Sequence, residues 1–167
     1  MIICDVEWDD PAGVALRKAQ RDELTLRYDD PNSEPGPAPT ADDMTVFLIA
    51  FEDDGTTPVA CGGLRQIDDA HGEVKRMFVE PDRRGSGVAA PVLRELERRA
   101  RALGWQRLVL ETGDRQPDAI RFYEREGYTR IPNFGYYAAS EYSVCYEKVL
   151  TARSFEEPLP RIGGAGG

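Results

Sequence analysis

The sequence predicts a mixed α/β fold, with antiparallel N-terminal strands, a central parallel pair and flanking helices. Runs rich in β-branched and aromatic residues at 45–52 and 58–67 are joined by the turn Asp-Asp-Gly-Thr, which is typical of an antiparallel hairpin. A strand pattern at 73–79 is followed by a helical pattern and then by a further strand pattern at 105–112. Two strands separated by a helical crossover are expected to pair in parallel, with a right-handed connection. This order of elements predicts a single domain over residues 1–150.

The N-terminal part predicts a strand, a helix and a long loop. An apolar run at 2–6 indicates the strand, and Asp9 and Asp10 are candidate N-caps ahead of a helical pattern at 11–28. Residues 29–43 are rich in Pro, Asn, Ser and Gly, which favours a loop. A loop of this length in a compact domain is often functional, and a mobile surface loop without a function explains this composition equally well.

The helix after the strand at 73–79 has clear boundaries. Apolar residues recur at three- and four-residue steps up to Leu103, and Gly104 follows as a C-terminal stop. Pro91 predicts that the helix either begins no earlier than Val88 or is kinked, because proline is tolerated without distortion only in the first turn. The glutamates at 95 and 97 stand four residues before arginines, which predicts ion pairs on a solvated helix face.

The C-terminal part predicts one more helix and two closing strands. Pro117 suits the first position of the helix, and Gly127 ends it. Strand patterns at 128–131 and 142–150 complete the sheet. The Pro/Gly-rich tail at 151–167 is predicted to be flexible.

Composition narrows the class of function. A hydrophobic fraction of 41% and a charged fraction of 31% are ordinary for a globular protein of 167 residues. The net charge of −9 argues against nucleic-acid binding, which requires a basic face, and is compatible with a cationic acceptor. Three scattered cysteines and one histidine do not favour a disulfide framework or a metal site. Neither a signal peptide nor a membrane-length apolar run is visible, so a cytoplasmic protein without a membrane partner is expected.

The loop at 83–87 has the chemistry of an anion site. Two arginines stand beside two glycines, immediately before the helix that begins near Val88. The first amides of a helix lack intrahelical partners, and the helix dipole attracts anions there. Glycine also lets a phosphate approach the main chain closely. A diphosphate site and an ordinary strand-to-helix loop with solvated arginines explain this pattern about equally well.

The residue patterns of two segments resemble motifs of a known family. Residues 84–89, RGSGVA, fit the Arg/Gln-x-x-Gly-x-Gly/Ala signature of the GNAT superfamily of N-acetyltransferases, and they fit neither a P-loop nor a Rossmann fingerprint. Residues 116–128, QPDAIRFYEREGY, resemble its Asn-x-x-Ala-x-x-x-Tyr-x-x-x-Gly-Phe/Tyr segment, with Gln116 in place of the usual asparagine. The resemblance extends over most of 2–150. The Glu-Thr-Gly at 111–113 and the motif IPNFGY at 131–136 resemble a bacterial subgroup that acts on small amines.

The resemblance implies a GNAT-like sheet and an acetyltransferase. The expected reaction moves an acetyl group from acetyl-CoA to a primary amine of a small molecule by direct attack in a ternary complex, without a metal. Three alternatives remain open: a CoA-binding sensor without efficient turnover, an acetyltransferase acting on protein lysines or N-termini, and a non-enzymatic interaction domain. The protein is expected to be a monomer or a homodimer.

The resemblance also assigns catalytic roles. It places a catalytic glutamate at Glu73, as the base that removes a proton from the amine, and an acid at Tyr123, which faces the thioester sulfur. Strand alternation predicts that Glu73 shares a face with Lys75, Met77 and Val79. A solvated strand-end carboxylate is the alternative for Glu73, and aromatic core packing is the alternative for Tyr123.

The remaining expectations concern the two substrates. Main-chain groups of the central strand, the loop, the helix start and one face of the last helix are expected to bind acetyl-CoA: Met77, Phe78, Val79, Arg83, Arg84, Gly85, Ser86, Gly87, Val88, Ala89, Gln116, Ala119 and Tyr123. Tyr28, the loop at 29–43 and the aromatic residues at 134–137 are candidate walls of the acceptor pocket, and simple packing explains the aromatic residues equally well.

Overall fold

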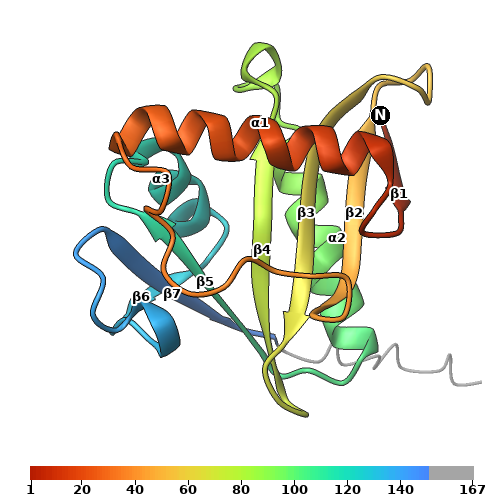
Figure 1. Ribbon diagram of the computed structural model, residues 1–167. Helices are drawn as coiled ribbons and strands as arrows, with labels where there is room; N and C mark the ends of the chain where they lie inside the picture. Colours follow the sequence, from red (N-terminus) through yellow and green to blue (C-terminus); the bar gives the residue numbers. More distant parts are fainter. Residues whose placement is uncertain (151–167) are drawn as a thin grey trace, which may run out of the picture.

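The structure, a computed structural model, describes residues 1–150 and contains one seven-stranded mixed sheet (Figure 1). The strands, in the sheet order β1-β2-β3-β4-β5-β7-β6, are β1 (Ile2–Asp5), β2 (Met44–Phe51), β3 (Pro58–Gln66), β4 (His71–Val79), β5 (Arg107–Gly113), β7 (Ser143–Val149) and β6 (Thr129–Ile131). The helices are α1 (Pro11–Tyr28), α2 (Ala89–Ala102) and α3 (Pro117–Arg125), with short 3-10 turns η1 (Pro81–Arg83) and η2 (Gly135–Tyr137). The predicted tail at 151–167 lies outside the described residues.

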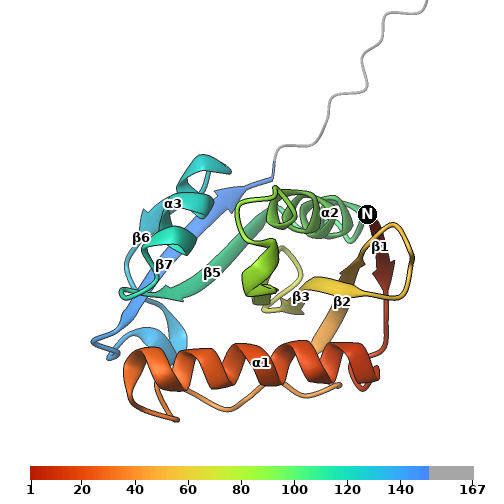
Figure 2. The same cartoon turned by 90° about the horizontal axis from the view of Figure 1, so that it is seen from above.

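The predicted fold class is confirmed. Helix α1 covers one face of the sheet, while α2 and α3 cover the other (Figure 2). β2 and β3 pair antiparallel, β4 and β5 pair in parallel, and the remaining neighbours are antiparallel. Within residues 1–150 no helix combines the length and the apolar character needed to cross a bilayer.

The helix boundaries follow from local chemistry. The Asp10 carboxylate accepts hydrogen bonds from the amides of Ala12 at 2.9 Å and Gly13 at 3.3 Å, which caps α1 as predicted. Pro91 falls in the first turn of α2, where its missing amide is not needed. Gly104 follows the end of α2 with φ +82°, a left-handed conformation that glycine adopts without strain.

The core lies on both faces of the sheet. Against α2 and α3, side chains such as Leu64, Leu93 and Leu108 are fully buried in the larger cluster. Against α1, a smaller cluster contains Leu16 and Ile49. Because both faces bury apolar side chains, the central strands are held rigidly in place.

One prediction for α2 is wrong. Glu95 pairs with Arg99 at 2.9 Å on the exposed side and Glu97 lies 3.9 Å from Arg101, both as expected, but the Glu97 side chain is buried instead of solvated. The Glu97 carboxylate accepts hydrogen bonds from Lys148 at 2.9 and 3.0 Å and from the Tyr128 hydroxyl at 3.2 Å. The strand that carries Lys148 is remote in sequence, so helical periodicity alone could not predict that it covers this part of α2.

The central parallel pair opens toward one end of the sheet. Cα partners join β4 and β5 only from His71 with Arg107 to Val74 with Leu110. Beyond that point the two strands diverge, as Figure 1 shows between β4 and β5. The opening therefore exposes main-chain groups of β4 at the end where the loop at 84–88 and the start of α2 lie.

A β-bulge interrupts β4 inside this opening. Phe78 pairs with Cys61 but Lys75 pairs with Gly63, so β4 contains one extra residue between these positions. The predicted alternation consequently fails at the bulge. Met77 packs with the α2-side core, as does Val79, whereas Phe78 packs with the α1-side cluster. Glu73 and Lys75 thus share a face that Met77 and Val79 do not share.

Candidate active site

A groove of about 730 Å³ runs between the open end of β4, the start of α2, and α1 and α3. Every residue predicted to bind acetyl-CoA lines it except Ser86: Met77, Phe78, Val79, Arg83, Arg84, Gly85, Gly87, Val88, Ala89, Gln116, Ala119 and Tyr123. The Ser86 hydroxyl instead donates a hydrogen bond to the Arg83 carbonyl at 2.5 Å. The structure therefore gathers two segments that are remote in sequence into one wall.

The loop before α2 presents bare main chain to this groove. Gly85 has φ +79° and Gly87 has φ +83°, and a Cβ built at either position would meet no atom within 4 Å. No side chain caps the first turn of α2. Within the loop the amides of Arg84 and Ser86 bond to nearby carbonyls. Open amides at a helix start suit a phosphate group, so the local geometry fits the diphosphate of CoA.

The two arginines of the loop are engaged with carboxylates of the chain. Arg84 binds Glu23 of α1 through both terminal nitrogens at 2.8 and 2.5 Å, and its Nε donates to the Val79 carbonyl at 3.0 Å. Arg83 pairs with Glu52. Hydrogen bonding to Arg84 lowers the pKa of Glu23, which therefore stays ionised at neutral pH. Direct contacts from these arginines to phosphate stay a prediction.

The carbonyls of β4 at the opening also have partners. The Gln20 side-chain amide donates a hydrogen bond to the Met77 carbonyl at 2.9 Å, and the Arg84 guanidinium donates one to the Val79 carbonyl. A pantetheine arm that pairs with this edge would use the amides of β4 or replace these side chains. The predicted main-chain contacts at Met77, Phe78 and Val79 stay predictions.

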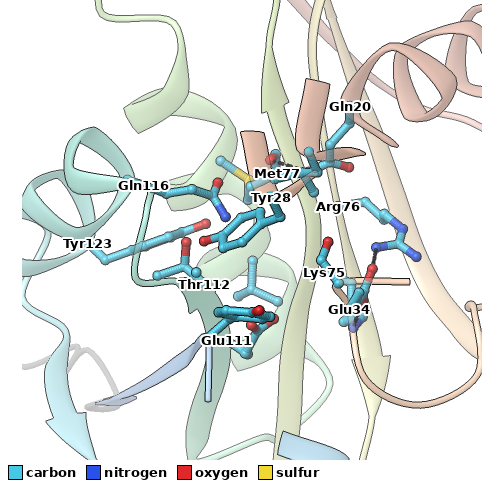
Figure 3. A pocket seen from close by; sticks show the side chains of 16 residues that line it. Gln20, Tyr28, Glu34, Lys75, Arg76, Met77, Glu111, Thr112, Gln116 and Tyr123 are labelled. Atoms are coloured by element: carbon cyan, nitrogen blue, oxygen red, sulfur yellow. Dashed lines mark hydrogen bonds and ion pairs between the residues drawn. The ribbon is translucent and has the colours of Figure 1, made fainter. Parts of the chain in front are cut away.

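A second, smaller cavity of about 100 Å³ lies on the other side of the opening (Figure 3). Polar side chains from six segments line it: Gln20, Tyr28, Ser33, Glu34, Lys75, Arg76, Glu111, Thr112, Gln116, Tyr123 and Tyr142. Six residues line both spaces: Gln20, Leu24, Met77, Gln116, Ala119 and Tyr123. The groove and the cavity therefore meet between β4 and α3.

Tyr123 stands at this junction. Its ring is tilted against Phe122 at 5.2 Å and meets Tyr128 edge-on at 5.7 Å between centroids, which fixes its orientation. Burial raises the pKa of Tyr123 well above its usual value, and the charge of Glu111 adds to this effect. The phenol is therefore protonated at neutral pH and can serve as a proton donor.

Glu111 lies near the end of β5, on the floor of the small cavity. Burial raises the pKa of Glu111 to about 7, and the neighbouring charge of Glu34 also raises it. A carboxylate with this pKa is suited to accept a proton near neutral pH. The sequence motifs assign Glu111 no catalytic role, although a lone carboxylate in the apolar run LVLET is a usable signal.

Glu73, the base expected from the sequence, lies outside both cavities. Its side chain is 1% exposed and accepts hydrogen bonds from Arg65 at 2.5 Å and from the Tyr137 hydroxyl at 2.7 Å. Lys75 lies 3.5 Å away. A base must reach the proton that it removes, directly or through one water. Glu73 as the base stays a prediction, and the geometry favours Glu111.

The other expected acceptor residues separate into two groups. Tyr28 lines the small cavity, and its hydroxyl accepts a hydrogen bond from the amide of Arg115 at 3.0 Å. The loop at 29–43 contributes Ser33 and Glu34. The aromatic residues at 134–137 line neither cavity. Tyr137 is instead buried, and its hydroxyl donates a hydrogen bond to Glu73 at 2.7 Å.

The glycine loop gives a first testable prediction. Gly87→Val is expected to raise the Kd for CoA at least about tenfold, or about 1.4 kcal/mol, because the new side chain projects into the groove. Gly104→Val is the matched control, since Gly104 has φ +82°, equally open surroundings and a place outside the groove. Both variants lose about 1–2 kcal/mol of stability through the left-handed backbone. Calorimetric titration with CoA tests this; equal Kd values for the two variants would contradict the phosphate site.

Comparisons with known proteins agree with this geometry. A sequence model described as the acetyltransferase (GNAT) family matches residues 7–128. An IAA acetyltransferase of Azospirillum brasilense is 39% identical over 105 residues, which are 62% of this chain and 67% of that protein. A crystal structure assigned as an acyl-CoA N-acyltransferase of Klebsiella pneumoniae is 29% identical, with a TM-score of 0.76 over 90% of this chain and 97% of the other. A GNAT family acetyltransferase of Elizabethkingia anophelis with acetyl-CoA bound shares the fold, at 15% identity and a TM-score of 0.65 over 89% of this chain and 97% of the other.

The mixed sheet with a split parallel pair and the uncapped start of α2 fit the fold of an acyltransferase. The family match covers most of the chain, so the protein belongs to the acetyltransferase (GNAT) family. The expected superfamily is thereby confirmed.

Proposed function

We propose that the protein transfers the acetyl group of acetyl-CoA to a primary amine of a small molecule, by direct attack within a ternary complex. The observation that carries this proposal is the meeting of the large groove and the small polar cavity at Tyr123. A donor held in the groove would present its thioester to an acceptor in the cavity. Holding both reactants in one opening removes much of the entropic barrier to attack.

Glu111 is proposed as the proton acceptor. At neutral pH the acceptor is an ammonium ion, which must lose one proton before its nitrogen lone pair can attack the thioester carbonyl carbon. The nitrogen gives up a second proton to solvent as the neutral amide forms. Glu111 lines the acceptor cavity, and burial raises its pKa to about 7, so it can take that proton near neutral pH. The new C–N bond then forms at the carbonyl carbon of the acetyl group.

Tyr123 is proposed as the proton donor to the leaving group. The C–S bond breaks as the amide forms, and the electron pair remains on the CoA sulfur. The Tyr123 phenol at the junction would give that sulfur a proton and would recover one from solvent. This chemistry requires acetyl-CoA as co-substrate and no metal.

The partners follow from the same proposal. The small volume of the cavity supports a small-molecule acceptor rather than a protein segment. The net charge of −9 supports the absence of a nucleic-acid partner. We further propose that the protein is a monomer or a homodimer without a membrane partner. We also propose that it acts in the cytoplasm, where acetyl-CoA is present and where the reducing conditions are compatible with its three free cysteines.

A panel of small amines and one lysine peptide, assayed for release of the free CoA thiol, tests the function. Thiol release with at least one small amine supports the proposal. Calorimetric binding of CoA without release on any acceptor would replace it by a CoA sensor. Release with the peptide alone would make the protein a peptide acetyltransferase.

A further inference from the structure

Two consecutive residues of β4, Lys75 and Arg76, reach the same carboxylate. Lys75 Nζ lies 2.9 Å from Oε1 of Glu34, and Arg76 Nη1 contacts the other oxygen, Oε2 (Figure 3). Neighbouring residues of a regular strand point to opposite faces of the sheet. The bulge at Arg76 overrides that alternation, so both cations meet on the cavity side.

The bulge places Arg76 in a strained backbone conformation. Arg76 has φ +58°, one of two positive values among non-glycine residues in the part of the chain that the structure describes. A left-handed conformation costs an ordinary residue about 1–2 kcal/mol. Such strain is retained mostly at ligand and catalytic sites, where the surrounding structure holds it in place. Here its effect is to aim a guanidinium into the wall of the acceptor cavity.

The buried charges of Lys75 and Arg76 require a negatively charged partner. The Lys75 and Arg76 side chains are only 7% and 8% exposed, and buried charges are costly unless they are paired. Lys75 keeps further partners, the Tyr137 hydroxyl at 2.7 Å and Glu73 at 3.5 Å. The only salt-bridge partner of Arg76 within residues 1–150 is Glu34.

Glu34, the carboxylate at this position, belongs to an irregular loop and is partly exposed. Its side chain is 29% exposed, so its carboxylate approaches the two buried cations from the solvent side. It belongs to the loop between α1 and β2, where residues 30–43 contain neither helix nor strand. That loop also touches η2, where the Tyr136 ring covers Gly36. A carboxylate on an irregular loop can be replaced at a lower energetic cost than one on a strand.

We propose that Lys75 and Arg76 form a carboxylate subsite, and that the acceptor is a small amine with its own carboxylate, such as an amino acid. The acceptor's carboxylate replaces that of Glu34, and its amine then faces Glu111 across the same cavity. This inference rests on the proposed function. It adds the acceptor class, because two cations and one proton acceptor that line the same cavity suit a molecule with both a carboxylate and an amine.

A purely structural role for the ion pairs predicts a different outcome. If Glu34 only pins the loop, a carboxylate on the acceptor gives no advantage. If Glu34 and Glu111 together bind a dication, a diamine is the better acceptor. Matched acceptors separate these cases, because an amino acid and its decarboxylated amine differ only in the group that the subsite would bind.

The experiment compares kcat/KM for three such pairs: alanine and ethylamine, phenylalanine and phenethylamine, lysine and cadaverine. The wild-type protein is expected to prefer the amino acid of at least one pair by about tenfold or more, as for one well-made charge-assisted contact. Equal or higher kcat/KM for the amines of all three pairs would overturn the carboxylate subsite.

Variants of Arg76 show whether the preference comes from this position. Arg76→Gln is expected to reduce the ratio of kcat/KM within the preferred pair to about one, and Arg76→Gly gives the same ratio on a backbone without strain at that φ. The matched control is Arg107→Gln, which removes an arginine paired with Glu147 at the opposite end of β5 and keeps the wild-type ratio. A ratio that survives in both Arg76 variants overturns the assignment.

A binding measurement distinguishes failure of the subsite from failure of the proposed function. Each of the three pairs is titrated calorimetrically into the complex with CoA, where no transfer can occur. Tighter binding of an amino acid than of its amine, lost in Arg76→Gln, supports the subsite even if acetyl-CoA is never turned over. If amines are acetylated but no amino acid binds more tightly than its amine, the proposed transferase function is supported and the carboxylate subsite is overturned.

Discussion

Glu111→Gln is expected to lower kcat about 1,000-fold, within the range by which a positioned general base accelerates a reaction. The amide keeps the shape of the side chain but cannot accept the proton of the amine. Glu111 lines the acceptor cavity, and the change leaves the cofactor groove untouched, because Glu111 does not line that groove. The Kd for CoA is therefore expected to change less than about twofold, which calorimetry measures beside the steady-state rate.

The pH profile provides the decisive readout for Glu111. Burial raises the pKa of this carboxyl to about 7, and only the deprotonated form can act as a base. The kcat/KM of the wild-type protein should therefore fall as pH decreases through about 7, and this acidic limb should be absent in Glu111→Gln. Glu73→Gln is the comparison variant. An acidic limb that disappears in Glu73→Gln and persists in Glu111→Gln would return the role of base to Glu73.

The same substitution should increase stability at alkaline pH. The pKa of Glu111 rises from 4.5 to about 7 on folding, so the folded state binds more protons than the unfolded state between these pH values. Stability from this group therefore falls as pH rises from 4.5 to about 7, and above that range the ionised carboxylate opposes folding. Glu111→Gln should accordingly raise Tm at pH 8 and change it less at pH 4.5. A lower Tm at pH 8 would contradict the buried, proton-accepting state.

The sequence predicts the fold well because local signals and the fold agree. Asp10, Pro91 and Gly104 mark helix ends through their own hydrogen bonds or backbone preferences, which need no knowledge of distant segments. The glycine loop is equally local, since Gly85 and Gly87 adopt left-handed conformations in the loop where the motif places them. These features could be predicted because each depends on a few neighbouring residues.

The acceptor side could not be predicted in this way, because its residues come together only in the folded chain. The bulge in β4 turns Arg76 toward Lys75, and neither residue type nor strand periodicity signals it. Glu34 lies 41 residues before Lys75, its ion-pair partner. The two glutamates also differ in their surroundings. Glu73 is hydrogen-bonded to Arg65 and Tyr137, whereas Glu111 lines the cavity. Residue type alone does not determine which of them reaches an acceptor.

Tyr123→Phe is expected to lower kcat about 100-fold, because it removes the proton donor to the leaving thiolate and keeps the ring. The ring contacts with Phe122 and Tyr128 do not involve the hydroxyl, so the fold and the groove wall remain intact. The Kd for CoA should therefore stay within about twofold of the wild-type value. Steady-state kinetics and calorimetric titration with CoA measure the two quantities separately.

Tyr146→Phe is the matched control for Tyr123→Phe. Tyr146 is buried and its hydroxyl donates to Glu124 at 2.9 Å, but it lines neither the groove nor the cavity. The loss of the Tyr146 hydroxyl in this control variant should leave kcat unchanged. Because Tyr123 acts on the leaving group, the loss of rate in Tyr123→Phe should also be the same for strongly and weakly basic acceptors. An unchanged kcat in Tyr123→Phe would show that the thiolate leaves without a proton from this residue, and water in the groove would then be the donor.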